Sequence, residues 1–336
     1  MDSSSESVCA FGAAALLRHL QAMLVEEPGV RRGQHIEHIH RMRGASRRLR
    51  AALPLFEECF PARKAGNWLK ALRRVTRSLG AARDTDVQLG VMAAFLTQSK
   101  KSQYIPGMRR LQVRWEQQRQ ELQKDVLKAL DEMQASRVFD KMGAALLPFT
   151  LGIEPGAPPA HALYELSNRA ITASLDEFLS YEPFIELPEK VAELHQMRIA
   201  AKRLRYTLET FAPLYSDGLA GYLSVLRNAQ DFLGDIHDCD VWSAVVPQFL
   251  EEEKERVVAF YGVQGPWNLL LPGVRAFLED RQAARNEKYQ TFLRKWQGWK
   301  QKQTWPNLRK ITSAPLIDKA ELYPPPAAAP APARAP

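Results

Sequence analysis

Apolar residues recur at helical spacing along nearly the whole of this 336-residue chain. Large side chains stand three and four positions apart, and no stretch alternates as a half-buried strand does. In the first half the pattern predicts helices over residues 10–26, 36–60, 65–82, 86–99 and 108–133. In the second half it predicts helices over residues 160–181, 188–214, 219–233, 240–254 and 274–299. We therefore expect an all-α fold.

Proline and glycine divide this pattern. Pro54 falls inside a predicted helix and should kink it or end it early, because proline has no amide hydrogen to donate. Residues 143–159 are crowded with proline and glycine and predict a linker. Residues 324–336 contain only proline, alanine and one arginine, which cannot build a core, so we expect disorder there. The predicted parts are a first helical half at 8–142, the linker, a second helical half at 160–303 and a C-terminal extension at 304–336.

Two of the predicted helices share one phrase. Residues 40–50 read HRMRGASRRLR, and residues 195–205 read HQMRIAAKRLR. At about 100° per residue, the histidine and three basic residues of each copy fall on one face about 80° wide, opposite the apolar residues. These residues are His40, Arg43, Arg47 and Arg50 in the first copy and His195, Arg198, Lys202 and Arg205 in the second. An ordinary solvated face mixes both signs in no fixed order, so this face is predicted to bind an anion. Arg48 and Arg203 complete the basic pairs and join the candidate set.

A second match follows at almost the same offset. Residues 79–87 read LGAARDTDV, and residues 233–241 read LGDIHDCDV. A looser match at a longer offset aligns Arg119 with Arg285 and implies an insertion around residues 261–272. The chain is therefore predicted to be an internal duplication of two similar halves.

The aspartate pairs in this second match suggest either caps or a metal site. They are Asp84 with Asp86, and Asp238 with Asp240. Each pair precedes a new apolar run, so we predict helix N-caps, with a salt bridge to an arginine of the basic face as an accompanying contact. His237 beside Asp238 favours a metal slightly in the second half. The first half has an arginine at that place, which argues against a shared metal role.

Composition narrows the partner and the compartment. The net charge of +8 and the isoelectric point near 9.4 favour a polyanionic partner. Cys9, Cys59 and Cys239 have no metal-ligand spacing and are predicted to be reduced thiols in a cytosol. The N-terminus lacks the basic region of a signal peptide, and by our estimate no apolar run reaches the length of a membrane span. We expect a cytoplasmic protein with no membrane partner.

The quoted motifs carry a family resemblance. Two halves, each with a His-x-x-Arg helix followed by Leu-Gly-x-x-x-Asp-x-Asp-Val, resemble the CHAD family, the conserved histidine α-helical domain, over roughly residues 10–300. The resemblance implies two four-helix bundles related by a pseudo-twofold axis, with the basic faces lining a central groove or pore. It also implies binding of inorganic polyphosphate. Stand-alone members that lack a fused triphosphatase domain are associated with polyphosphate granules, so granule-associated proteins are further expected partners.

The chemistry of the residues supports that ligand. Polyphosphate carries charge on every phosphate of a flexible chain, so a continuous trough of cations suits it better than one deep pocket. Arginine stays charged and holds two phosphate oxygens at once through its planar fork. Arginines that could extend the trough are Arg73, Arg77, Arg119, Arg227 and Arg285. The first half is expected to contribute more strongly to polyphosphate binding, because in the second half Asn228 and Asp231 stand in place of Arg74 and Arg77.

Other ligands and activities fit the sequence less well. A nucleic-acid backbone is the alternative ligand, but such grooves usually interleave stacking aromatics with the cations, whereas Trp68, Phe56 and Phe211 lie on apolar faces. We expect no enzyme, because an acidic metal cluster, a nucleophile motif and a phosphate loop are all missing from the sequence. We expect no metal and no cofactor, because no HExxH or CxxC spacing occurs. His40 and His195 are expected to contact phosphate, with a structural hydrogen bond, catalysis or metal ligation as the alternatives.

Overall fold

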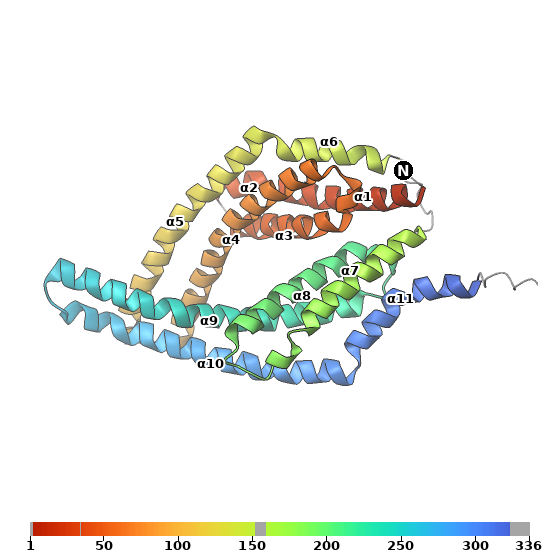
Figure 1. Ribbon diagram of the computed structural model, residues 1–336. Coiled ribbons are helices and arrows are strands. Elements are labelled where there is room, and N and C mark those ends of the chain that lie inside the picture. The colour runs from red at the N-terminus through yellow and green to blue at the C-terminus, as the bar shows by residue number, and fades with distance from the viewer. Residues whose placement is uncertain (1–2, 34, 152–158, 323–336) are drawn as a thin grey trace, which may run out of the picture.

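Helices account for all the regular structure in the part of the chain that the computed structural model describes, residues 3–33, 35–151 and 159–322 (Figure 1). The all-α fold is therefore confirmed. In the first half they are α1 (Ser3–Leu24), α2 (Glu27–Arg32), α3 (Ile36–Ala52), η1 (Leu53–Cys59), α4 (Ala62–Ser99), η2 (Ser102–Tyr104), α5 (Ile105–Ser136) and α6 (Val138–Thr150). In the second half they are α7 (His161–Leu179), η3 (Glu182–Phe184), α8 (Val191–Phe211), η4 (Ala212–Leu214), α9 (Ala220–Tyr261), α10 (Gly265–Gln301) and α11 (Thr304–Leu322).

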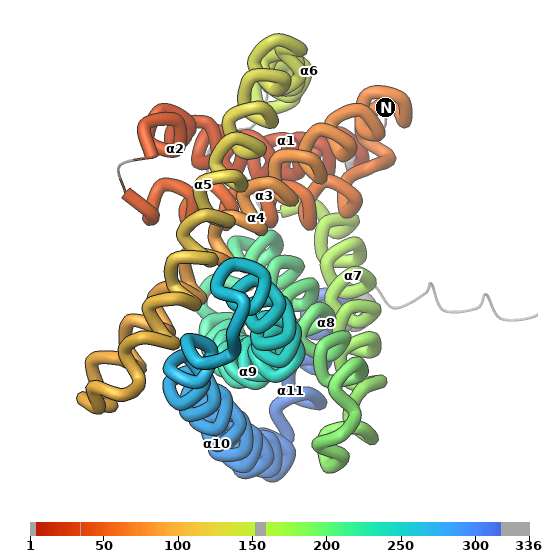
Figure 2. Tube along the Cα trace, turned by 90° about the vertical axis from the view of Figure 1, so that its left-hand side faces the viewer, coloured from red at the N-terminus to blue at the C-terminus, as the bar shows by residue number. Residues whose placement is uncertain are grey.

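The helices form two layers joined by long hairpins. α1 packs on α3 and α6 in the first layer, and α8 packs on α7 and α9 in the second. α4 and α5 run from the first layer down to the far ends of α9 and α10 (Figures 1 and 2). α3 and α8, the two helices that carry the basic phrase, contact each other across the halves.

The apolar faces of the two phrase helices build the main core. Met42 and Leu49 of α3 and Met197 and Leu204 of α8 are completely buried. Burying a side chain of this size stabilises the fold by about 1.5–3 kcal/mol relative to leaving it exposed. The opposite faces of α3 and α8, which carry the basic residues, are thereby held at the junction of the halves. The predicted amphipathic character of both helices is confirmed.

Two glycines allow α5 and α10 to cross in close contact. A Cβ atom on Gly107 would lie 2.0 Å from the backbone oxygen of Leu270, and one on Gly273 would lie 2.1 Å from that of Tyr104. Any side chain at either glycine would force the helices apart. The two contacts are counterparts of each other. Tyr104 corresponds to Leu270, and Gly107 corresponds to Gly273, at the same offset that aligns Arg119 with Arg285. This reciprocity supports the interpretation of the chain as a duplication.

α4 and α9 are continuous where two helices each were predicted. The Thr85 hydroxyl donates to the backbone oxygen of Ala81 at 3.0 Å, as a residue inside a helix does. Asp84 and Asp86 bind arginine side chains instead of capping amides. The N-cap prediction is therefore wrong, because both carboxylates have partners on other helices. The accompanying salt bridge is present, since Arg43 Nη2 lies 2.8 Å from Asp84 Oδ1.

The boundaries of the halves differ in part from those predicted. α3 ends at Ala52 and a 3₁₀ segment follows, as Pro54 indicated. The predicted linker, in contrast, begins inside α6, whose Met142 and Leu146 are fully buried, so residues up to Thr150 belong to the first half. The remainder of the linker, 152–158, lies outside the described residues.

The C-terminal extension begins as part of the second half. Trp305 and Leu308 of α11 are buried, and Arg309 pairs with Asp176 of α7. The apolar residues continue beyond position 303, and they cover α7, so the boundary at 303 is too early. The disorder predicted for 324–336 concerns residues outside the described part of the chain.

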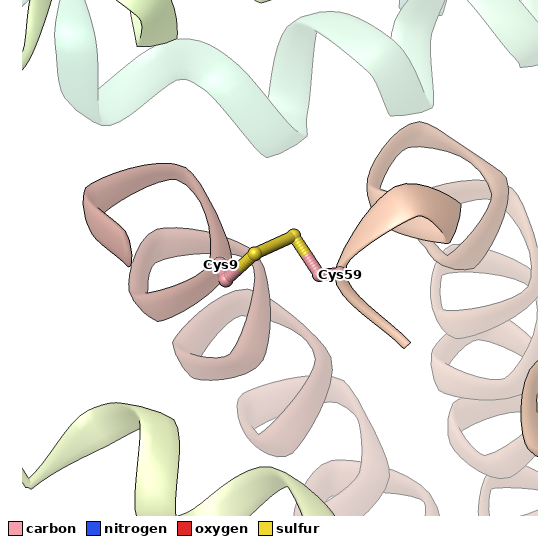
Figure 3. The surroundings of a disulfide bond; sticks show 2 residues. All are labelled: Cys9 and Cys59. Atoms are coloured by element: carbon pink, nitrogen blue, oxygen red, sulfur yellow. A yellow bond between two sulfur atoms is a disulfide. The ribbon is translucent and has the colours of Figure 1, made fainter. Parts of the chain in front are cut away.

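A disulfide bond links α1 to the end of η1 (Figure 3). Cys9 and Cys59 are 50 residues apart in sequence, with their Cα atoms 5.3 Å apart. The prediction of reduced thiols is wrong for this pair, because the chain reversal through η1 brings the two cysteines together. Their spacing in the sequence does not indicate this contact. Cys239 is free and buried, and burial raises the pKa of its thiol to about 11.

One segment has the length and composition of a membrane span. An 18-residue window within Ser5–Arg32 has a mean hydropathy of 1.6, so the expectation that no apolar run reaches this length is wrong. Leu16, Leu20 and Met23 of this segment are buried in the main core. A helix of a protein core passes the same test, so the segment is weak evidence for a span.

Candidate functional site: a basic face shared by two halves

Four cationic side chains of α3 and α8 lie close enough that their charges affect one another's pKa. They are Arg43, Arg47, Arg198 and Lys202, and we call them the central basic face. Burial lowers the pKa of Lys202 to about 7, with the charges of Arg198, Arg47 and Arg43 as further causes. Burial and the charge of Arg47 lower the pKa of Arg43 to about 10. The structure thus brings together four of the predicted residues, two from each half.

The Leu-Gly motifs explain how two of these arginines are placed. A Cβ atom on Gly80 would lie 3.7 Å from Arg43 Nε, and one on Gly234 would lie 3.6 Å from Arg198 Nε. Arg43 therefore lies across Gly80, and Arg198 lies across Gly234 in the other half. Both Nε atoms are buried and lack a hydrogen-bond partner among the described residues. An unsatisfied buried donor costs about 1–3 kcal/mol, and an acceptor supplied by a ligand would remove that cost.

Carboxylates lie at the rim of the central basic face. Asp84 accepts the hydrogen bond from Arg43 Nη2 at 2.8 Å, and its side chain is 65% exposed. Loss of solvent raises the pKa of Asp238, the matching residue, although the charge of Arg198 opposes that shift. No ion pair to Asp238 occurs within residues 3–33, 35–151 and 159–322. The rim therefore neutralises only part of the positive charge.

Arg48 of α3 ties the two phrase helices together, and Arg205 contacts the same two side chains from within α8. Arg48 Nε donates to Glu209 at 2.7 Å, and Arg205 Nη1 lies 3.4 Å from the other oxygen of that carboxylate. Both guanidinium groups also lie over the Tyr206 ring, at 5.7 and 5.0 Å from its centroid. These two predicted residues lie beside the central basic face, but they are engaged in contacts within the protein.

Arg50 continues the central basic face toward α4. Loss of solvent and the charges of Arg47 and Arg73 lower its pKa, which places Arg73 close to it. Arg73 and Arg77 are exposed and line a hollow of about 570 Å³ between α4, α5 and α6. Arg73 thus lies next to Arg50, and the extension of the trough to Arg77 stays a prediction. In the second half Arg227 is exposed and forms no ion pair with a described residue.

Three other predicted arginines are engaged elsewhere. Arg119 Nε donates to Asp86 at 2.6 Å, and Arg285 Nε donates to Asp240 at 2.5 Å, so the same bond occurs in both halves. Arg203 pairs with Glu177 of α7. We therefore leave these three out of the binding set, because each is neutralised by a carboxylate that is far less exposed than Asp84, the partner of Arg43. The sequence analysis missed this because it assigned the aspartates to caps.

The two motif histidines have different neighbours. His40 is exposed, and desolvation together with the charge of Arg83 lowers its pKa. His195 Nδ1 lies 3.0 Å from Nδ1 of His237 on α9. Burial and nearby cations lower the pKa of His195 and bring that of His237 to about 4. His237 was outside the predicted set, although it occupies the place of Arg83 in the repeat.

A comparison with protein families matches residues 14–247 to the CHAD domain. The chain belongs to the CHAD domain family. Members of this family bind polyphosphate or take part in polyphosphate metabolism. The match includes α3, α8 and both Leu-Gly motifs, and it stops before Arg285 of α10. The family resemblance given by the sequence is confirmed.

Solved structures show the same CHAD fold. The crystal structure of the CHAD domain from the plant Ricinus communis has a TM-score of 0.56 and 24% identity, over 81% of this chain and 91% of that chain. PptA from Streptomyces chartreusis has a TM-score of 0.59 and 16% identity, over 88% of this chain and 99% of that chain. At these identities the likeness concerns the fold alone. No curated protein sequence matches this chain.

Lys202 should make anion binding by this CHAD domain depend on pH. The charged and titratable groups facing it are Arg198 and His195 on its own helix, Arg43 and Arg47 on α3, Asp84 on α4, and His237 and Asp238 on α9. A bound anion favours the charged amine, so affinity should fall as pH rises through about 7, by up to about tenfold per pH unit. Binding titrations from pH 6 to 9 at constant ionic strength measure this.

The matched variant is Lys202→Arg, which keeps its charge across that range and should bind almost independently of pH. Equal pH profiles for the two proteins would contradict the assignment.

The pH dependence of the stability of the free protein has the opposite sign to that of binding. Since the unfolded chain binds more protons between pH 7 and 10.5, the free protein should become more stable as pH rises there.

Proposed function

We propose that this CHAD domain binds inorganic polyphosphate through the central basic face together with Arg50. The supporting observation is the gathering of Arg43, Arg47, Arg198 and Lys202 in one partly buried place. Burial, and after it the charges of the neighbouring cations, lowers the pKa of Arg43, Arg198 and Lys202. Such crowding is unfavourable in the free protein. A chain of phosphates relieves it, because each phosphate supplies a negative charge and oxygens that accept from guanidinium groups.

Polyphosphate fits this surface better than a nucleic acid does. Proteins that bind single-stranded RNA or DNA typically add aromatic faces on which the bases stack. Beside the central basic face, the ring of Tyr206 is 9% exposed and lies beneath the guanidinium groups of Arg48 and Arg205. A ligand that consists of phosphates alone uses the cations and needs no stacking surface.

The proposal contains no catalytic step. The described residues hold no group of three or more His, Cys, Asp or Glu side chains placed to bind a metal ion for phosphate hydrolysis. The role we propose is retention of polyphosphate on polyphosphate granules, where granule-associated proteins are the further partners.

The salt dependence of binding tests the proposed ligand. Cations that neutralise phosphates release counterions, so log K should fall linearly with log salt concentration, with a slope that reflects several contacts. Titrations of long-chain polyphosphate between about 50 and 300 mM salt measure the slope. Single-stranded RNA, as a competitor at fixed salt, should displace polyphosphate poorly. A flat salt response, or displacement by RNA at equal phosphate concentration, would refute the proposal.

A further inference from the structure

A stripe of four cations lies on α4, outside the central basic face. Lys70, Arg73, Arg74 and Arg77 follow the i, i+3, i+4, i+7 spacing of one helix face, and all four are exposed. They line one side of the hollow between α4, α5 and α6. Of the described residues that line this hollow, one is a carboxylate, Glu132 of α5, which pairs with Arg74. The stripe therefore keeps an excess of positive charge.

Apolar side chains form the floor of the hollow. Val75 of α4 and Ala129 and Met133 of α5 line it and are buried, whereas the cations at its edge are exposed. Its volume of about 570 Å³ lies in the range of pockets for small organic ligands, about 300–1,000 Å³. A thioether such as that of Met133 makes favourable contacts with an aromatic ring. The hollow therefore combines a cationic rim with a floor suited to a flat apolar group.

The second half does not repeat this arrangement in its sequence. At the offset that aligns the two Leu-Gly motifs, the positions of Lys70, Arg74 and Arg77 hold Ser224, Asn228 and Asp231. Two positions that line the hollow hold aromatic residues instead: Phe232 in place of Ser78, and Trp299 in place of Met133. Both aromatic side chains pack in the main core, and Trp299 is 8% exposed. The stripe and the floor are therefore features of the first half, unlike the central basic face, which both halves build.

The two parts of the hollow call for a ligand with two parts. Polyphosphate has no apolar group to place on the floor, so it would leave Val75 and Met133 against water. A nucleoside without phosphates would cover the floor and leave the cations of the stripe unpaired. A ligand that carries phosphates at one end and a flat ring at the other satisfies both.

We propose that the hollow binds a nucleoside triphosphate, with its base on the apolar floor and its phosphates along the stripe of α4. The arginines of the stripe donate to phosphate oxygens, and Lys70 adds a point charge. Asn67 lies about one turn before Lys70, lines the same hollow, and offers both a donor and an acceptor to the edge of the base. The ligand and the site are separate from those of polyphosphate, so this inference does not rest on the proposed function.

Photolabelling locates the base. 8-azido-ATP, which carries its photoreactive group on the adenine ring, is irradiated with the full-length protein in EDTA, and the labelled peptides are mapped by mass spectrometry. The label should fall within residues 71–78 or 129–138, and excess ATP should prevent it. Tripolyphosphate and adenosine should each protect about 10-fold less well than ATP, because each lacks one part of the contacts. Label in other parts of the chain, or equal protection by tripolyphosphate, would overturn the nucleotide site.

Variants measure how much the rim and the floor contribute to ATP affinity in isothermal titration. Lys70→Glu reverses one exposed charge of the stripe and should weaken ATP binding about 10-fold or more. The matched control is Lys295→Glu, the same charge change at an exposed lysine of α10 that stands at the position of Ala129 in the repeat. It should leave the ATP affinity unchanged.

A double variant fills the floor. Ser78→Phe with Met133→Trp transfers the two aromatic residues of the second half into the hollow, and it should abolish ATP binding while the affinity for long-chain polyphosphate is retained. Circular dichroism shows whether this variant folds. A folded double variant that binds ATP like the wild type would overturn the inference, and one that loses polyphosphate together with ATP would show that the hollow is only the end of the polyphosphate trough. Equal ATP affinities of Lys70→Glu, Lys295→Glu and the wild type would also refute the site, whether or not the double variant folds.

Discussion

Replacing Arg47 and Arg198 together by alanine should weaken polyphosphate binding about 100-fold or more, because each charge-assisted contact contributes about 1.5–3 kcal/mol. The two residues come from different halves, so the variant removes one cation from each side of the central basic face. Isothermal titration with long-chain polyphosphate measures the loss. The matched control is Arg203→Ala on α8, whose guanidinium pairs with Glu177 and should leave the affinity unchanged.

The same double variant should remain folded and become slightly more stable without ligand. Its positions lie opposite the buried Met42 and Met197, and its substitutions remove repulsion among the remaining cations. Circular dichroism and the melting temperature check this. A folded double variant that binds like the wild type would show that the face is merely solvated.

Long polyphosphate should bind about 10²- to 10⁴-fold more tightly than tripolyphosphate. A chain that reaches the cations of both halves makes the second engagement intramolecular, whereas a short ligand contacts fewer of them at once. Affinities are compared per molecule at one salt concentration.

Replacing Arg198 and Lys202 by alanine should reduce this advantage more than it reduces binding of tripolyphosphate, because the second half is then lost as an anchor. Equal affinities for long and short ligands in the wild type would indicate a single compact pocket and contradict a shared face.

The periodicity of the sequence was sufficient for the fold class and for the direction of the two basic faces. Since an α-helix repeats every 3.6 residues, the positions of Met42 and Leu49 determine that Arg43 and Arg47 point the other way. The repeated order of residues then marked α3 and α8 as the helices to compare. The direction of each basic face and the match between α3 and α8 could both be read from residues within a single helix.

The ion pairs of the site could not be predicted from the sequence, because their two residues lie far apart along the chain. Arg119 and Asp86 belong to different helices, so neither residue alone shows that the arginine is already paired. The same holds for Arg48 and Glu209, which come from different halves. The continuity of α4 was missed for a related reason, because aspartates that form ion pairs resemble capping aspartates in sequence. The positions of Gly80 and Gly234 did carry a signal, since the motif repeats, but its meaning required the arginine that lies across each glycine.

The contact of Arg43 with Gly80 recurs as that of Arg198 with Gly234, so each half presents one arginine to the central basic face in the same way. A polymer with a chemical direction, such as a nucleic-acid strand, meets such a face in two different ways, and only one of them can be optimal. Polyphosphate has no direction along its chain. Under the proposed function, either end of such a chain therefore meets Arg43 in the first half or Arg198 in the second through the same kind of contact.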